Sequence, residues 1–347
     1  MSHFPLEVSI FGPGYGECIL IHIGANKWVV IDSCLNSKKE SVALHYLNEI
    51  GVPFVNIVQV IATHWHDDHI RGLAQIVQEA KHCIFTFSSA LSCDEFFTLA
   101  ANNGLNISTT TTSGIQEFHK ILDIINLRGS KLQFADENKQ IFLDTELSVS
   151  IKSLSPSDET RVHALKKIAD LFPQVNMERK RLPSITPNIA SVVTHIKIND
   201  QEILLGADLE ESNLQGWSTI ISSQTRDSIK ANIFKIPHHG SRNADIPQIW
   251  STLLIKHVAA VVTPYSKGKK LPSNADIKRL KENTENLFQT SAPEAKRITR
   301  TGVSQKLINS TVKSIQTVQY CCGQVRFRFD PVAKIWNEEL FGNASKL

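Results

Sequence analysis

Residues 57–69 read IVQVIATHWHDDH, an apolar run that leads directly into three histidines and two aspartates. A short apolar run of this kind is typical of a buried strand. In an extended loop alternate side chains point the same way, so His64 and His66 can bind one cation. Asp68 and His69 follow after a turn, at the start of the next helix, and can face a second cation. Imidazole and carboxylate are common ligands of Zn²⁺ and similar metals. The stretch therefore predicts a metal site, rather than a chance cluster of polar surface residues.

Two more strand-like runs end in residues of the same chemistry. Residues 232–236 are followed by Pro237-His238-His239-Gly240-Ser241, and residues 201–206 are followed by Asp208. Ligands collect at the carboxyl ends of strands in α/β sheets. A lone aspartate in such a place is more often a helix N-cap. Together with the first cluster, however, these residues predict a two-metal site with a bridging carboxylate.

The rest of the chain alternates between strand and helix patterns. We expect an early β-meander at 6–11, 18–23 and 27–31, and later strands at 57–62, 84–87, 131–134, 140–143, 147–154, 190–198, 201–206, 232–236 and 257–262, with the last near 324–329. Helical spacing of apolar residues predicts helices at 38–50, 70–81, 94–127, 158–183, 210–222, 245–255 and 273–284. The pattern favours one α/β domain over residues 1–347, with two sheets faced by helices.

Composition limits the class of protein. The 347 residues include 41% hydrophobic residues, and 37 Lys and Arg stand against 34 Asp and Glu, a net charge of +3. Such a chain has a real core, which excludes disordered and fibrous classes, and its weak overall field means that any nucleic-acid contact must be local. No apolar run is long enough to span a membrane. The six cysteines form no CxxC pair and no secretory signal is apparent, so we expect reduced thiols and a cytoplasmic protein.

The motif HxHxDH, formed by His64, His66, Asp68 and His69, resembles the signature of metallo-β-lactamase-fold hydrolases. The resemblance implies a four-layer αββα sandwich. It also implies that Asp32, which ends the run WVVIDSC, orients the motif, and that Asp208 bridges both metals. The PHHGS run would supply the final histidine of the second site, either His238 or His239.

The likeness is closest to the hydrolase domain of the competence DNA-uptake protein ComEC. It is carried by residues 11–34 (FGPGYGECILIHIGANKWVVIDSC), 187–193 (PNIASVV), 234–244 (FKIPHHGSRNA) and the stretch from VVTPYSKGKK at 261 to about 290. Inserts interrupt it at about 94–140 and 156–185, and closing strands are expected at about 300–330. No membrane channel is attached, so DNA uptake itself does not transfer.

One position departs from the common family pattern. Many members carry another histidine, in a GHTxGS-like turn, where residues 186–191 here read TPNIAS. The first metal is then left with His64, His66 and Asp208, with Asn188 or water as a substitute ligand. Such a site is harder and tolerates Mn²⁺ as well as Zn²⁺. One divalent ion, rather than two, is the open alternative.

We expect a metal-dependent phosphodiesterase or nuclease. A bound cation lowers the pKa of water from 15.7 to about 7, and the resulting hydroxide can attack a phosphodiester. Asp68, Asp67 and His239 are the candidates for catalysis, Ser241 and Arg242 could hold a phosphate oxygen, and Trp65 either stacks on a base or belongs to the core.

Two basic stretches favour a DNA or RNA substrate. Residues 265–300 carry nine basic against four acidic residues, and residues 160–182 carry six against two. Such stretches could follow a phosphate backbone, or be ordinary solvated helix faces. The alternatives are a hydrolase for a cyclic nucleotide, phosphocholine ester, lactone or lactam, and a non-catalytic metal-binding subunit of a protein partner. The sequence does not predict whether the chain forms homo-oligomers.

Overall fold

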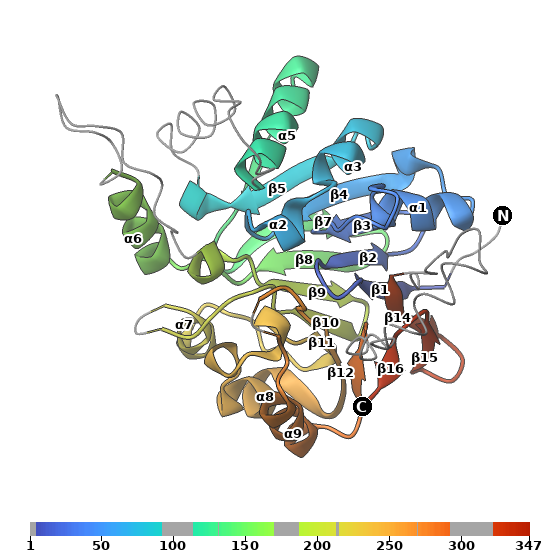
Figure 1. Cartoon of the computed structure of the whole chain (residues 1–347), viewed down its shortest axis with the longest axis vertical. Helices are drawn as coiled ribbons and strands as arrows, with labels where there is room; N and C mark the ends of the chain where they lie inside the picture. Colours follow the sequence, from blue (N-terminus) through green and yellow to red (C-terminus); the bar gives the residue numbers. More distant parts are fainter. Residues whose placement is uncertain are drawn as a thin grey trace, which may run out of the picture.

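The computed structural model describes residues 5–91, 114–130, 132–169, 187–212, 215–268, 270–291 and 322–347. These residues form two eight-stranded sheets (Figure 1). Across the first sheet the order is β15 (Ile335–Phe341), β14 (Gly323–Asp330), β1 (Glu7–Gly12), β2 (Cys18–His22), β3 (Trp28–Ile31), β4 (Ile57–Ala62), β5 (Ile84–Ser88) and β6 (Leu132–Ala135). Across the second sheet it is β16 (Ser345–Lys346), β13 (Leu287–Gln289), β12 (Leu254–Val262), β11 (Ala231–Lys235), β10 (Gln201–Leu205), β9 (Thr194–Ile198), β8 (Val149–Ser153) and β7 (Lys139–Asp144).

Helices cover the outer face of each sheet. The described helices are α1 (Val42–Glu49), α2 (Asp67–Ile70), α3 (Leu73–Glu79), α5 (Gly114–Arg128), α6 (Asp158–Ala169), α7 (Trp217–Ser222), α8 (Pro247–Leu253) and α9 (Asn274–Asn283). Figure 1 shows α1, α3 and α5 beside the first sheet, and α7, α8 and α9 beside the second. None of the helices described is long and apolar enough to cross a membrane.

The alternation of side chains along the strands creates these layers. In β2, Ile19 and Ile21 pack between the two sheets, whereas Leu20 packs against α1 and α3 on the outer face. Both faces are buried, so the strands read as nearly continuous apolar runs. A third core lies between the second sheet and its helices, where Phe234 of β11 meets Trp217 of α7. The expected αββα sandwich is therefore confirmed.

Three predicted elements around the site have different boundaries. The helix expected at 70–81 is divided into α2 and α3 at Gly72, which has a φ of 87°. The helix expected at 210–222 begins only after Gly216, where φ is 94°. The strand expected from 190 starts at Thr194, because Pro187–Ala190 form a turn of 3₁₀ helix.

Other predictions concern the middle and the end of the chain. In the interval 94–140, α5 and β6 correspond to parts of the helix expected at 94–127 and of the strand expected at 131–134, and Phe118 of α5 is 1% exposed in the core of the first layer. Residues 92–113 and 170–186 lie outside the described part of the chain, as does the expected region of closing strands before 322. The strand near 324–329 is not the last, since β15 and β16 follow it.

Parallel strands bring the functional loops to one edge of the sandwich. Strands β3, β4 and β5 are parallel in the first sheet, and β10, β11, β12 and β13 are parallel in the second. A hydrogen bond from the Val192 amide to the Thr63 carbonyl, 3.1 Å long, joins the two halves beside these strand ends. The loops that follow β3, β4, β10 and β11 are therefore positioned to share one site.

Candidate metal centre

The loop after β4 supplies four side chains to the site. His64 and His66 lie on extended backbone, and the Nε2 atom of His64 is 3.2 Å from the Nδ1 atom of His66. The chain then turns into α2, which places Asp68 and His69 on its first turn. His64, Asp68 and His69 are buried, whereas His66 is half-buried at the pocket.

Asp32 holds this loop from below. Its Oδ1 atom accepts a hydrogen bond from the Thr63 amide at 2.8 Å, and its Oδ2 atom accepts from the Thr63 hydroxyl at 2.7 Å. The same Oδ2 atom accepts from Nδ1 of His69 at 2.7 Å. Because the Thr63 hydroxyl donates to Asp32, it accepts from Nδ1 of His64, 2.9 Å away. Both imidazoles therefore turn their Nε2 lone pairs towards the site, as metal-binding histidines require.

Asp208 lies between the histidines of both halves. Its Oδ2 atom is 4.0 Å from Nε2 of His64 and 3.5 Å from Nε2 of His239, and its Oδ1 atom is 3.3 Å from Nε2 of His69. The residue before it, Ala207, has a φ of 47°. This sharp turn after β10 directs the carboxylate back over the strand ends.

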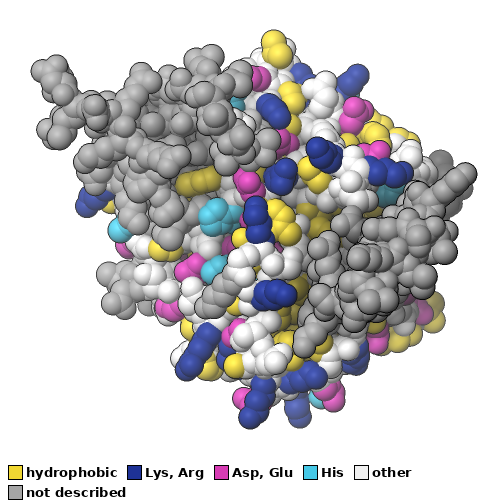
Figure 2. Space-filling model, viewed as in Figure 1, with side chains coloured by type: hydrophobic (Ala, Val, Ile, Leu, Met, Phe, Trp, Pro, Cys, Tyr) yellow, Lys and Arg dark blue, Asp and Glu magenta, His cyan; other side chains and the backbone are white. Residues whose placement is uncertain are grey.

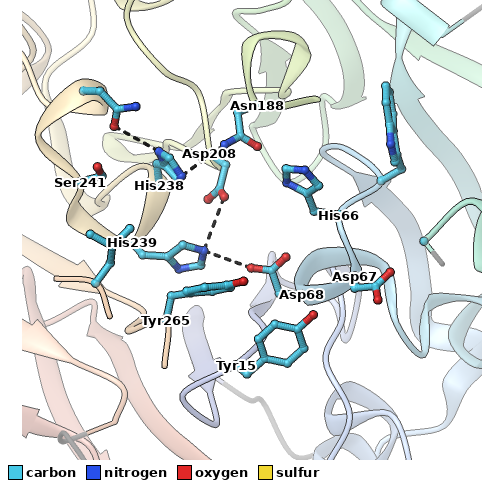
Figure 3. A pocket seen from close by; sticks show the side chains of 14 residues that line it. Tyr15, His66, Asp67, Asp68, Asn188, Asp208, His238, His239, Ser241 and Tyr265 are labelled. Atoms are coloured by element: carbon cyan, nitrogen blue, oxygen red, sulfur yellow. Dashed lines mark hydrogen bonds and ion pairs between the residues drawn. The ribbon is translucent and has the colours of Figure 1, made fainter. Parts of the chain in front are cut away.

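The structure also distinguishes between the two adjacent histidines. Both have positive φ, 43° for His238 and 54° for His239, but their side chains contact different groups. His239 donates from Nδ1 to the Thr263 carbonyl at 2.8 Å, and its Nε2 atom lies 3.2 Å from Oδ2 of Asp68 (Figure 3). His238 instead faces Glu210, Asn188 and Asn243. Of the two, His239 is the one that belongs to a group of donor atoms spaced to hold a cation.

Two overlapping groups of donor atoms that contain Asp208 are spaced to hold a cation, beside a third group formed by Asp32, His64 and His69. Donor atoms lie within 4.8 Å of one another in the group Asp68, His69, Asp208 and His239, and in the group His64, His66 and Asp208. In the described part of the chain, Nε2 of His69 and Oδ1 of Asp208 are buried without a hydrogen-bond partner. Unpartnered buried polar atoms are costly. A divalent ion would satisfy both atoms, so these residues fit one or two such ions.

Electrostatics keep the site prepared for a cation. Burial and the nearby imidazoles of His69 and His66 lower the pKa of His64, which keeps it neutral. Burial alone would oppose ionisation of Asp208, but the imidazoles of His239 and His69 hold its pKa well below the usual range. Burial likewise opposes charge on His239, yet the Asp208 carboxylate raises the pKa of that imidazole to about 9. A cation would compete with protons for these side chains, because histidine and carboxylate ligands bind a metal in their deprotonated form.

The donor groups open into a pocket of about 630 Å³. Tyr15 and Tyr265 form one wall, with ring centroids 5.6 Å apart, and the Nζ atom of Lys267 lies 4.6 Å from the centroid of Tyr15. Trp65 lines the pocket and also packs against the first core, so the two interpretations of this residue are compatible. Ser241 lines the pocket, whereas Arg242 is exposed and is not among its lining residues.

Asp67 has a local structural partner at the pocket wall. Its carboxylate accepts a hydrogen bond from the backbone N–H of Gly114, the first residue of α5. Burial raises the pKa of this carboxyl group, although Gly114 and the charges of Arg71 and Lys267 partly offset the effect. Asp67 belongs to neither donor group.

Several residues of the site were not identified from the sequence. Glu17 and Lys235 form a buried ion pair of 2.5 Å beneath the metal loops, and Glu210 contacts Asn188 and His238. The lysine in the apolar run NIFKI indicates a buried ion pair, since a buried lysine requires a partner. No sequence pattern predicts that Tyr15 and Tyr265 lie at the pocket.

Much of the basic sequence lies outside the described residues or is already paired. Lys269, Lys296, Arg297 and Arg300 fall outside the described residues, and so do Arg179, Lys180 and Arg181. Among the described residues, Arg279 binds Asp245, Asp276 and the Gly240 carbonyl, the last at 2.7 Å. Arg279 therefore supports the His239 turn rather than a ligand.

One family model matches the first part of the chain. Residues 11–91 match the family model of the metallo-beta-lactamase superfamily. No curated protein sequence matches the chain.

Solved structures similar to the chain include the metallo-beta-lactamase fold protein YhfI from Bacillus subtilis, with 13% identity, a TM-score of 0.41, and coverage of 82% of this chain and 95% of that one. A HARLDQ-motif mutant of a metallo-beta-lactamase from Cronobacter sakazakii has 11% identity, a TM-score of 0.34, and coverage of 71% and 69%. The metallo-beta-lactamase SMB-1 bound to 2-mercaptoethanesulfonate has 10% identity, a TM-score of 0.39, and coverage of 69% and 80%.

Proposed function

We propose that this chain, with its metallo-beta-lactamase superfamily domain, is a metal-dependent phosphodiesterase that cleaves nucleic acid. The observation that carries the proposal is the convergence of His64, His66, Asp68, His69, Asp208 and His239 around unpartnered buried atoms. Zn²⁺ or Mn²⁺ in these groups would supply Lewis acidity and lower the pKa of a bound water. Asp208 is the shared carboxylate.

The protein's own residues support a phosphodiester substrate at the pocket. Lys267 lies over the ring of the pocket residue Tyr15, although it does not itself line the pocket. The positive charges of Lys267 and Arg71 both lower the pKa of Asp67. Such cations can attract a phosphate. Figure 2 shows exposed histidines near the middle of one face, with Lys and Arg side chains close to them.

Aromatic rings next to these cations suit a nucleobase. Tyr15, Tyr265 and Trp65 all line the pocket. Stacking of a base on an aromatic side chain contributes about 1–3 kcal/mol and is tolerant of sequence. Ser241, on the opposite wall, offers a hydroxyl to a phosphate oxygen. The resemblance to the ComEC hydrolase domain also favours DNA or RNA.

A small-molecule hydrolase is the second candidate. The pocket volume of about 630 Å³ lies in the range of about 300–1,000 Å³ that is typical of small-ligand sites. A cyclic nucleotide or phosphocholine ester would use the same cations and metal donors. A lactone or lactam would not need Lys267.

The test uses the full chain, stripped with a chelator and reloaded with Mn²⁺ or Zn²⁺. We would assay labelled single-stranded and double-stranded DNA and RNA, a chromogenic phosphodiester, a lactone and a chromogenic cephalosporin. His66→Ala and Asp208→Ala should abolish hydrolysis while circular dichroism stays unchanged, and His257→Ala, at an exposed histidine, should have no effect.

The possible results separate the candidates. Hydrolysis of nucleic acid that depends on His66 and Asp208 supports the proposal. Hydrolysis of the lactone or cephalosporin alone contradicts it in favour of the small-molecule enzyme. Full metal occupancy without hydrolysis of any substrate contradicts it in favour of a non-catalytic subunit. Activity that persists in both variants contradicts the assignment of the site.

A further inference from the structure

Asn188 presents a buried oxygen to the site. The residue lies in the 3₁₀ turn Pro187–Ala190, is 7% exposed, and lines the pocket. In the described part of the chain its Oδ1 atom is buried and has no hydrogen-bond partner. Figure 3 shows this oxygen on the side of His66, and the amide nitrogen on the side of His238.

Glu210 determines this orientation of the amide. Its Oε1 atom accepts a hydrogen bond from Nδ2 of Asn188 at 2.7 Å. An ionised carboxylate only accepts hydrogen bonds, so the flipped amide would place its oxygen against another acceptor. Nδ2 of Asn188 also lies 3.2 Å from Nε2 of His238. The two amide hydrogens of Asn188 therefore both find acceptors, Glu210 and His238, only when the amide nitrogen points towards them.

Glu210 is itself held in place. Its Oε2 atom accepts from Nδ2 of Asn243 at 2.8 Å, and Oε1 lies 3.3 Å from Nδ1 of His238. Nδ1 of His238 is also 3.3 Å from Oδ1 of Asn243. Because both neighbours of Nδ1 are oxygen acceptors, Nδ1 carries the proton, and Nε2 is free to accept from Asn188. The four side chains thus fix one another.

We infer that Glu210 is a positioning residue that holds the Asn188 carbonyl oxygen as a ligand of the cation bound by His64 and His66. The inference rests on the proposed function, because it assumes that this group of donors binds a metal. That group otherwise has only two imidazoles and the shared Asp208 carboxylate. An amide oxygen is a harder ligand than imidazole and suits Mn²⁺ better. Glu210 therefore sets the metal preference of this position without touching the metal.

The test measures metal binding without any substrate. The stripped full-length chain is titrated with Mn²⁺, and the electron paramagnetic resonance signal of free Mn²⁺ gives affinity and stoichiometry. Residues that orient metal ligands usually account for about 10-fold to 100-fold in affinity. We expect Glu210→Ala to weaken one Mn²⁺ position by that factor, with Glu210→Gln between it and the parent chain.

A matched control lies next to Glu210. Glu211 has the same side chain, but its Oε2 atom accepts from the Ser218 amide at 2.9 Å, whereas Glu210 accepts from Asn188. Glu211→Ala should therefore bind Mn²⁺ like the parent chain. A double-mutant cycle with Asn188→Leu tests whether Glu210 acts through Asn188. In the Asn188→Leu background, Glu210→Ala should cause no further loss of affinity.

Replacement of the oxygen ligand provides a gain-of-binding test. Asn188→His should raise the ratio of Zn²⁺ to Mn²⁺ affinity. In the Asn188→His background, Glu210→Ala should leave the affinity for Zn²⁺ unchanged, whereas in the parent chain it reduces the affinity for Mn²⁺. The inference is overturned if Glu210→Ala binds Mn²⁺ normally, or if it weakens binding equally in the Asn188→Leu background. Absence of metal binding by the parent chain would instead contradict the proposed function. The stability of each metal-free variant, measured by unfolding, shows whether a loss of metal affinity is caused by misfolding.

Discussion

Replacement of Lys235 by methionine should destabilise the protein strongly. Lys235 is 0% exposed and Glu17 is 1% exposed, and the two are joined by the 2.5 Å ion pair. Lys235 also donates to the Ala207 carbonyl at 3.1 Å, and Glu17 accepts from the Thr263 hydroxyl at 2.6 Å. The variant would leave the Glu17 charge buried without its partner.

The magnitude follows from the burial of both charges. Removal of one partner from a buried ion pair costs about 3–5 kcal/mol, whereas replacement of both by neutral groups of similar volume is often close to neutral. We therefore expect Lys235→Met to lower the free energy of unfolding by about 3–5 kcal/mol. The double variant Glu17→Gln/Lys235→Met should recover most of this loss, because the amide oxygen that replaces the carboxylate can still accept from Thr263.

Urea unfolding of the metal-free protein, followed by circular dichroism and fluorescence, measures these differences. Arg328→Met serves as the control, because Arg328 is 31% exposed although its partner Glu7 is 1% exposed. Arg328→Met should lower the free energy of unfolding by less than Lys235→Met does. The reasoning is refuted if Lys235→Met costs less than the control, or if the double variant is as unstable as the sum of the single variants.

Further variants and conditions test other features of the structure. Gly16→Ala should cost about 1–3 kcal/mol by urea unfolding, because Gly16 has a φ of 108° and a new Cβ would lie 2.6 Å from Cβ of Cys34; unchanged stability would contradict this packing. Burial lowers the pKa of His22 below its ordinary 6.5, so the unfolded chain takes up the proton first. Stability should fall as the pH drops through 6.5 towards the folded pKa, by about 1.4 kcal/mol per unit of difference. His22→Gln should lose this slope and exposed His257→Gln should keep it; equal slopes in all three proteins would refute the assignment. Chelation should lower the melting temperature, since free metal at 100 times its Kd stabilises the folded chain by about 2.7 kcal/mol; an unchanged melting temperature would mean that no metal was bound.

The architecture could be predicted because it depends on local patterns. The apolar run 57–62 is strand β4, and the cluster that follows it lies at the end of that strand, as the sequence indicates. The short strands before it also form the expected meander. These features need only the alternation of side chains and a turn between strands.

What could not be predicted depends on contacts between distant residues and on single backbone angles. The lysine in NIFKI indicates a buried partner, but nothing in the sequence identifies Glu17 as that partner. His238 and His239 are adjacent and chemically identical, and only the fold places His239 beside Asp68 and His238 beside Glu210. Strand β15 was missed because Ile335–Phe341 is mostly exposed and has weak alternation.

The pairing of β1 with β14 has a consequence for biosynthesis. Strand β1 lies between β2 and β14, so residues 323–330 supply the second neighbour of residues 7–12. A nascent chain leaving the ribosome therefore exposes one edge of β1 until nearly all of the remaining residues have been translated. Contacts between such distant segments also slow folding in general. Chaperones that shield unpaired strands during translation would therefore have a large effect on the yield of this protein. The effect would be smaller for a protein whose first strands pair with all their neighbours early in translation.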